Sequence, residues 1–120
     1  MAEYIVKPGR RTRPPVHPGR LLKTSVFPEL GLSMTRAADI LGISRQMLHK
    51  ITREDNPETI TPEMAVKIGA LCGNGTDIWI NMQRNYDVWH ANRKVDVSSI
   101  LKARKELEKP RAAAGVQTLP

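Results

Sequence analysis

The segment Met34–Arg53 constrains the fold of this chain more than any other part of its sequence. It contains two short stretches with helical periodicity, separated by Gly42, and Ser44 opens the second stretch. Ala38 lies where the two helices would cross, and its small side chain allows their backbones to approach closely. Gly42 lies where the first helix ends, a position that favours a residue able to adopt positive φ. This spacing predicts a helix-turn-helix, a motif whose second helix enters the major groove of DNA.

The side chains of the predicted motif divide into an apolar and a polar set. Apolar residues in and beside the two helices are available to anchor the pair to a core: Ile40, Leu41, Ile43, Leu48 and Ile51. Long polar residues at positions i, i+1, i+4 and i+5 of the second helix share one face: Arg45, Gln46, His49 and Lys50. We therefore expect this polar face to contact DNA.

The formal net charge of +7 suits a nucleic-acid-binding protein, but the excess lies at the two ends of the chain. Residues 1–24 contain six basic and one acidic residue, and residues 94–120 contain six basic and three acidic residues. The central residues 25–93 contain seven basic and eight acidic residues. Basic tails supply phosphate contacts that do not depend on base sequence, but they also serve solubility alone. Sequence specificity therefore has to come from the helix-turn-helix itself.

The remaining segments also predict helices, and the aromatic content of only 4% argues against a sheet protein. Prolines indicate an extended arm over residues 1–16, and the first helix is expected to start at Pro18 and end before Pro28. Ser33 is a suitable N-cap for the helix that follows. A further helix starts after Thr61 and ends at residues 73–75, and another runs from about residue 77 to residue 93. Residues 95–109 predict a short additional helix, followed by a frayed end.

Four large side chains in the helix at 77–93 recur at spacings of three and four residues: Trp79, Met82, Tyr86 and Trp89. Such a stripe is too apolar for a face exposed to solvent. It forms either intramolecular core or a dimer interface. Because a small five-helix domain offers little core, we expect part of this stripe to contact a second subunit.

The sequence gives no sign of an enzyme, a metal site or a cofactor site. The histidines are scattered and lack partners at the spacing of metal ligands, and no glycine-rich phosphate loop is present. The single cysteine, Cys72, excludes an intramolecular disulfide framework and suits a reducing cytoplasm. No stretch approaches the roughly 20 apolar residues of a membrane span. We therefore expect a cytoplasmic binding protein without a cofactor.

Four blocks of this sequence carry a resemblance to a known family: HPGRLL at 17–22, LGLSMTRAADILGISRQMLHKI at 30–51, ITPEMAVKIGALCG at 60–73 and TDIWINMQRNYDVWHANRK at 76–94. They resemble successive parts of the HigA/VapI family, the antitoxins of host-inhibition-of-growth toxin–antitoxin modules within the phage-repressor-like (XRE/Cro-CI-type) helix-turn-helix group. The HPG start and the W-x-N-x-Q-x-x-Y-D-x-W block are its specific features. This chain departs from the family at Arg20, where an acidic residue is usual, at Met34, where the wider group often has a phosphate-binding Gln, and in the more acidic loop 52–59.

The resemblance implies an all-α, five-helix phage-repressor-like domain at residues 17–94, between the basic arm at 1–16 and a C-terminal extension at 95–120. It implies a cytoplasmic homodimer that binds a palindromic operator in double-stranded DNA and represses its own operon. It also implies a cognate partner, a RelE-like toxin that cleaves mRNA and is neutralised in a complex. A stand-alone repressor of the same fold remains an alternative, as does an interaction module whose helix-turn-helix is only structural.

The candidate DNA-binding residues divide into base-reading and phosphate-binding groups. Arg45 and Gln46 are the candidates for base edges, because arginine suits guanine O6 and N7 while glutamine suits adenine N6 and N7. Lys50 is expected to reach a base or a phosphate, and His49 either does the same or only packs at the rim of the interface. Phosphate contacts are predicted for three further residues, with helix capping or ordinary surface charge as the alternative: Ser44, Arg36 and Arg53.

Overall fold

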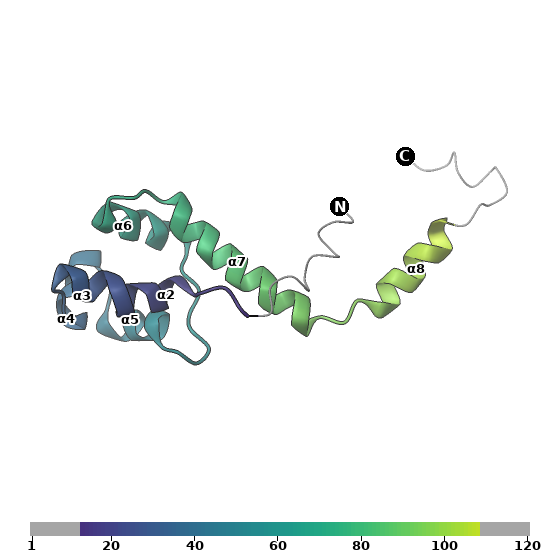
Figure 1. Ribbon diagram of the computed structural model, residues 1–120, viewed down its shortest axis with the longest axis horizontal. Coiled ribbons are helices and arrows are strands. Elements are labelled where there is room, and N and C mark those ends of the chain that lie inside the picture. Colours follow the sequence, from purple (N-terminus) through teal and green to yellow (C-terminus); the bar gives the residue numbers. More distant parts are fainter. Residues whose placement is uncertain (1–12, 109–120) are drawn as a thin grey trace.

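The computed structural model describes residues 13–108, which form helices and connecting loops with no strand among them. The all-α prediction is therefore confirmed. The elements are α2 (Pro18–Leu21), η2 (Leu22–Val26), α3 (Phe27–Leu30), α4 (Met34–Leu41), α5 (Arg45–Thr52), α6 (Pro62–Cys72), α7 (Asp77–Lys94) and α8 (Ser98–Glu108). Figure 1 shows α2 to α6 gathered beside the first half of α7, while the rest of α7 leads away toward α8. The predicted arm at 1–16 and the predicted frayed end lie largely outside the described residues.

The first helical stretch runs from Pro18 to Leu30, so the prediction that it ends before Pro28 is wrong. The chain forms a π turn at Leu22–Val26, where the N–H of Phe27 donates to the carbonyl of Leu22, five residues earlier. This wider turn relieves the clash between a proline ring and the preceding turn. Pro28 then occupies the first turn of α3, where its missing N–H has no cost.

Hydroxyl side chains cap the next three helices as their sequences predict. Ser33 Oγ accepts from the N–H of Arg36 at 3.1 Å, and Ser44 Oγ accepts from the N–H of Met47 at 3.0 Å. Thr61 Oγ1 does the same for α6 at 3.1 Å. Between α4 and α5, Gly42 has a φ of 71°, as expected for the turn of the motif. Local side-chain chemistry therefore fixes where these helices begin.

The core draws on every helix of the domain body, which comprises α2 to α7, and its largest fully buried side chain is Trp79, 1% exposed. Its indole Nε1 donates to Asn74 Oδ1 at 2.8 Å, so the buried polar atom is satisfied. Of the apolar residues predicted to anchor the motif, three are buried and Ile43 is partly buried against the core: Leu41, Leu48 and Ile51. The prediction is wrong for Ile40, which is 45% exposed because it lies on the outer side of α4.

The HPG sequence starts the domain and fixes α2 against α5. His17 is buried, and its Nδ1 accepts from the N–H of Gly19 at 2.9 Å. A Cβ at Gly19 would collide with the carbonyl of Ile51, so the two backbones approach more closely than any side chain allows. These residues are therefore a structural start of the helix.

The predicted additional helix is present as α8, at Ser98–Glu108, one link beyond α7. All of its residues are exposed, and it lies apart from the domain body in Figure 1. Within the described part of the chain, none of the helices combines the length and apolar character needed to cross a membrane.

Candidate nucleic-acid interface

Helix α5 has one side fixed to the core and one side open. Leu48 and Ile51 are buried on its inner side. The predicted contact residues are all exposed on its outer side: Arg45, Gln46, His49 and Lys50. The structure also places Met47 there, 37% exposed, which the sequence analysis did not include. Its position next to Gln46 was the available signal, since an apolar side chain in this place suits a thymine methyl group.

Three candidate residues lie around the start of α5: Ser44, Arg36 and Arg45. Ser44 is exposed, and because its oxygen accepts from the N–H of Met47, its hydroxyl hydrogen remains a donor. Arg36 and Arg45 line the same shallow hollow between the starts of α4 and α5, together with Ser33, Asp39 and Ile43. Arg36 Nη1 lies 3.4 Å from Asp39 Oδ2, and both side chains are largely exposed. The arrangement puts cationic groups beside a helix start, where the positive end of the helix dipole also attracts anions.

The structure gives Arg53 a local partner. Its Nε donates to the carbonyl of Asn56 at 2.9 Å, and the N–H of Glu58 donates to the carbonyl of Lys50 at 2.8 Å. These bonds fold the loop 53–59 back against the end of α5. Arg53 therefore holds the loop, and its contact with phosphate stays a prediction.

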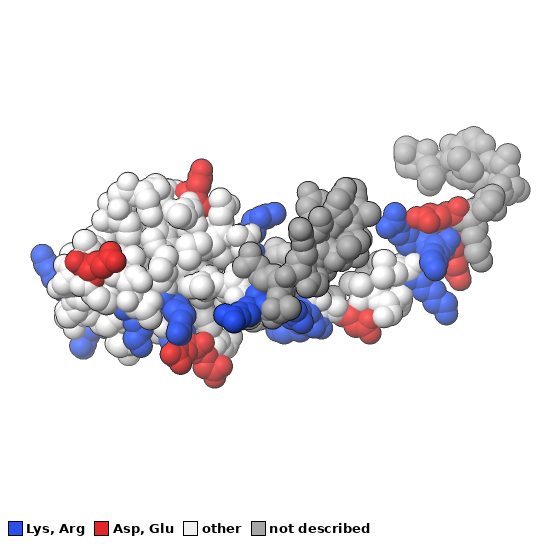
Figure 2. Space-filling view, viewed as in Figure 1, with Lys and Arg blue, Asp and Glu red and all other residues white. Residues whose placement is uncertain are grey.

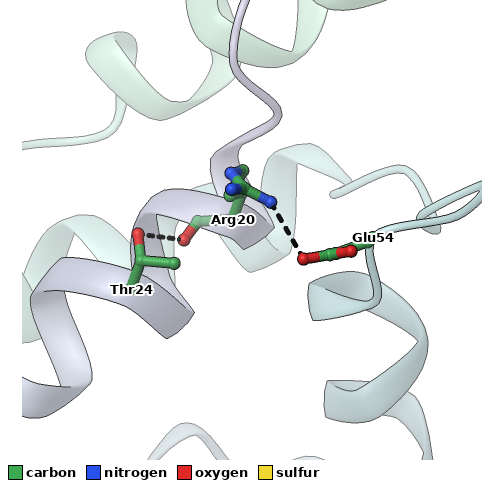
Figure 3. A network of polar contacts seen from close by, with 3 residues as sticks. All are labelled: Arg20, Thr24 and Glu54. Atoms are coloured by element: carbon green, nitrogen blue, oxygen red, sulfur yellow. Dashed lines mark hydrogen bonds and ion pairs between the residues drawn. The ribbon is translucent and has the colours of Figure 1, made fainter.

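Two of the positions at which this chain departs from the family pattern, Arg20 and the acidic loop 52–59, contact each other. Arg20 Nη1 lies 3.3 Å from Glu54 Oε2, which belongs to the acidic loop after α5 (Figure 3). Thr24 Oγ1 donates to the carbonyl of Arg20 at 2.8 Å in the same helical stretch. Because both charged side chains are more than half exposed, this ion pair contributes at most about 1 kcal/mol to stability. The basic residue at 20 thus offsets part of the negative charge of the loop.

Charge on the domain body is mixed. In Figure 2, lysine and arginine side chains lie beside aspartate and glutamate side chains on the face shown, and the described residues form no continuous basic patch across it. This agrees with the even balance of charge in residues 25–93. Non-specific attraction to phosphate is therefore modest in the body, and contacts made by α5 have to supply selectivity.

The stripe on α7 divides between core and surface. Trp79 is buried inside the chain, and Met82 packs partly buried against the core. Tyr86 and Trp89 are only half-buried. Of the two alternatives for the stripe, core or dimer interface, the structure selects core for Trp79, because its side chain is already enclosed by its own domain. Met82, Tyr86 and Trp89 stay candidates for a dimer interface, since each is only partly buried.

Ring contacts connect the outer half of α7 with the start of the domain. The rings of His17 and Tyr86 meet edge to face with centroids 4.8 Å apart, and those of Tyr86 and His90 lie 4.3 Å apart. His90 also meets Trp89 at 5.0 Å, and the guanidinium of Arg93 lies 4.2 Å from the centre of the Trp89 ring.

Among the described residues, no group of three His, Cys, Asp or Glu could hold a metal ion.

Gln83 is a buried polar residue that sequence reasoning missed. It is 4% exposed, its Oε1 accepts from the N–H of Ile60 at 2.9 Å, and its Nε2 donates to Asp87 Oδ1 at 3.0 Å. It therefore ties α7 to the segment before α6. The available signal was its place in the repeating α7 block, four residues after Trp79 on the same face.

The surroundings of the His17 imidazole favour its neutral form. Burial lowers its pKa, although the Asp87 carboxylate and the nearby carbonyl of Glu58 act in the opposite direction. Since Nδ1 accepts from the N–H of Gly19, the ring proton of the neutral form is on Nε2. The geometry and the pKa therefore favour the same state.

Comparison with models of protein families finds no match. The chain is 31% identical over 80 residues to virulence-associated protein I of Dichelobacter nodosus, an alignment covering 67% of this chain and 72% of that protein. It is 27% identical over 82 residues to antitoxin HigA-1 of Vibrio cholerae, covering 68% and 75%. Among solved structures, a Pseudomonas aeruginosa protein in complex with its operator DNA has a TM-score of 0.60 and 25% identity, over 84% of this chain and 98% of that chain. With this similarity and the helix-turn-helix built as described, the chain belongs to the HigA/VapI family of helix-turn-helix proteins.

Proposed function

We propose that this protein is a DNA-binding antitoxin of the cytoplasm that represses its own operon as a dimer and neutralises a RelE-like, mRNA-cleaving toxin. The observation that carries the DNA-binding part is the division of α5 into a buried side and an exposed polar side. Such a helix is rigidly mounted and free to enter the major groove.

Two residues in the first turn of α5 are assigned to base recognition. Arg45 and Gln46 are exposed at the end of the helix that leads into the groove, and both side chains can form bidentate contacts with a purine. Ser44 and Arg36, beside them, are assigned to the flanking phosphates. These backbone contacts would position α5, while Arg45 and Gln46 would read the sequence.

The half-buried part of the α7 stripe supports binding as a dimer, and the similarity to a protein solved with its operator DNA supports an operator as the ligand. Two copies related by a twofold axis require two half-sites one helical turn apart, about 34–36 Å along the DNA. DNA footprinting upstream of the gene, with sedimentation of the complex, tests this. Two protected half-sites bound by two chains are expected. Binding of one chain to a single half-site would contradict the dimer.

Toxin neutralisation is supported by the similarity to a protein named as an antitoxin. Co-expression with the neighbouring reading frame tests it directly. Growth arrest by the neighbour alone, relieved by this protein, is the expected result. A neighbour that is harmless alone, or toxic in spite of this protein, would instead favour a stand-alone repressor of the same fold.

A further inference from the structure

Helix α8 has an apolar stripe that is largely exposed, and none of the other helices at residues 13–108 packs against it. Ile100, Leu101 and Leu107 are 62%, 46% and 71% exposed, and they lie within one side of the helix. Helix α8 has 11 residues, and an isolated helix of this length is marginally stable in water. The helix therefore gains stability only when this stripe packs against another surface.

The link between α7 and α8 directs α8 away from its own domain. Asp96 Oδ1 accepts from both the N–H and the hydroxyl of Ser98, at 3.0 and 2.6 Å, and so caps α8. Val95 closes α7 by donating its N–H to the carbonyl of Ala91 at 3.0 Å. The corner is thus built from specific hydrogen bonds, and Figure 1 shows α8 continuing outward from it.

A surface of matching character lies on the outer half of α7. It is a hollow lined by Asn56, Tyr86, Trp89, His90, Arg93 and Lys94. Its lining includes three rings, and the guanidinium of Arg93 lies on the ring of Trp89. Asn56 belongs to the loop that also contains Asp55 and Glu58, and Arg93 and Lys94 at the end of α7 are basic.

The charges of α8 complement both sides of this hollow. Lys105 and Glu106 flank the apolar stripe on opposite sides of the helix. When the stripe lies on the rings, Lys105 can face the acidic loop while Glu106 faces Arg93 and Lys94. Arg104, which falls within the stripe, is already paired with Glu108 at 2.9 Å. Burying the stripe therefore costs less free energy than it would if the charge of Arg104 were unpaired.

We propose that α8 is an arm that packs into the α7 hollow of a second copy of this chain. The exchange is symmetric, since each copy offers one arm and one hollow, and it extends the contact made by Tyr86 and Trp89. This inference rests on the proposed dimer and identifies the surfaces that form it.

Crosslinking of two differently tagged chains tests the placement of the arm. In a Cys72→Ser background, one chain carries Leu101→Cys and the other Arg93→Cys, and a short bismaleimide can then join only different chains. A crosslinked pair is expected, whereas Thr35→Cys in place of Arg93→Cys should give none. A dimer in sedimentation without the crosslink overturns the arm but leaves the proposed dimer intact. A crosslink found only within a chain carrying both substitutions means that α8 folds back on its own α7, and this also overturns it.

The dimer dissociation constant gives an independent test with a matched control. Ile100→Gln removes apolar contact in two symmetric places and should weaken the dimer about tenfold or more. Lys102→Gln introduces the same side chain on the opposite side of α8 and should change the constant less than about twofold. Equal effects of the two variants would overturn the proposal. A full-length chain that sedimented as a monomer at all concentrations would overturn the proposed dimer together with it.

Discussion

His17 is the residue whose chemistry depends most directly on its place in the fold. It starts α2 by accepting from the N–H of Gly19, and its ring packs on Tyr86 of α7. Protonation would convert Nδ1 from an acceptor to a donor and would place a charge in a buried site. The neutral imidazole of His17 therefore joins the start of α2 to α7, the longest helix, and protonation would disrupt this link.

The free energy of unfolding should consequently fall as the pH drops below about 6.5, the ordinary histidine pKa. Because burial lowers the pKa of His17 in the folded state, the unfolded chain binds the proton first, and stability is lost between the unfolded and folded pKa values. Denaturant unfolding at several pH values measures this. His17→Asn can still accept from Gly19 but does not titrate, so it should remove this component. His49→Asn, at an exposed position, should keep the wild-type dependence, and an equal change in both variants would contradict the assignment.

Gln83 should be the most important buried polar side chain of α7 for stability. Gln83→Ala leaves the buried N–H of Ile60 without its acceptor and should cost about 1–3 kcal/mol in the free energy of unfolding. Asn85→Ala, exposed on the same helix, should change it by less than about 0.5 kcal/mol. Thermal or urea unfolding of both variants provides the comparison. Equal losses of unfolding free energy in the two variants would show that the hydrogen bond to Ile60 does not contribute to stability as expected.

Helical spacing places Gln83 on the face of Trp79, but its bond to Ile60 could not be predicted from the sequence, because the two residues are 23 positions apart. Ile40 shows the reverse error. Its apolar character indicated burial, but the direction in which α4 presents each side chain depends on the helices around it. The polar face of α5 was predictable, since four positions at helical spacing define a side without reference to the rest of the fold.

At the scale of helices, local chemistry predicted most boundaries. Hydroxyl caps and the turn at Gly42 act within a few residues, and the structure confirms them. The exception is Pro28, which ordinarily ends a helix. Here the π turn before it, with its five-residue hydrogen bond, allows the helix to continue to Leu30. The rule failed because it assumes an α-helical turn.

The two roles of Ser44, helix cap and phosphate contact, can be separated by substitution. Ser44→Ala should destabilise the protein by about 1 kcal/mol, because the N–H of Met47 loses its acceptor. Ser44→Asp can still cap α5 and should retain stability, but its carboxylate would repel a phosphate. Unfolding and DNA-binding measurements on both variants check this. Unchanged DNA affinity for Ser44→Asp would show that Ser44 only caps the helix.

For the whole molecule, the sequence predicted an all-helical helix-turn-helix fold, and the structure confirms it. The net charge of +7 did not locate the interface, because the excess lies outside residues 25–93. Whether an apolar stripe is core or contact surface also could not be decided from periodicity. The structure divides it between a buried Trp79 and a half-buried outer part. The dimer proposed above would therefore use the outer half of α7 and the arm beyond it.

The central claim, that α5 reads DNA sequence, is tested most directly by Arg45→Ala and Gln46→Ala. The affinity of each variant is measured at constant salt for the DNA upstream of the gene and for a set in which each base pair is changed in turn. Each substitution should cost about 1–3 kcal/mol and relax discrimination at one base position in each half-site. Uniform weakening across all sequences would contradict the claim, because it would mean that these side chains contact only the phosphate backbone.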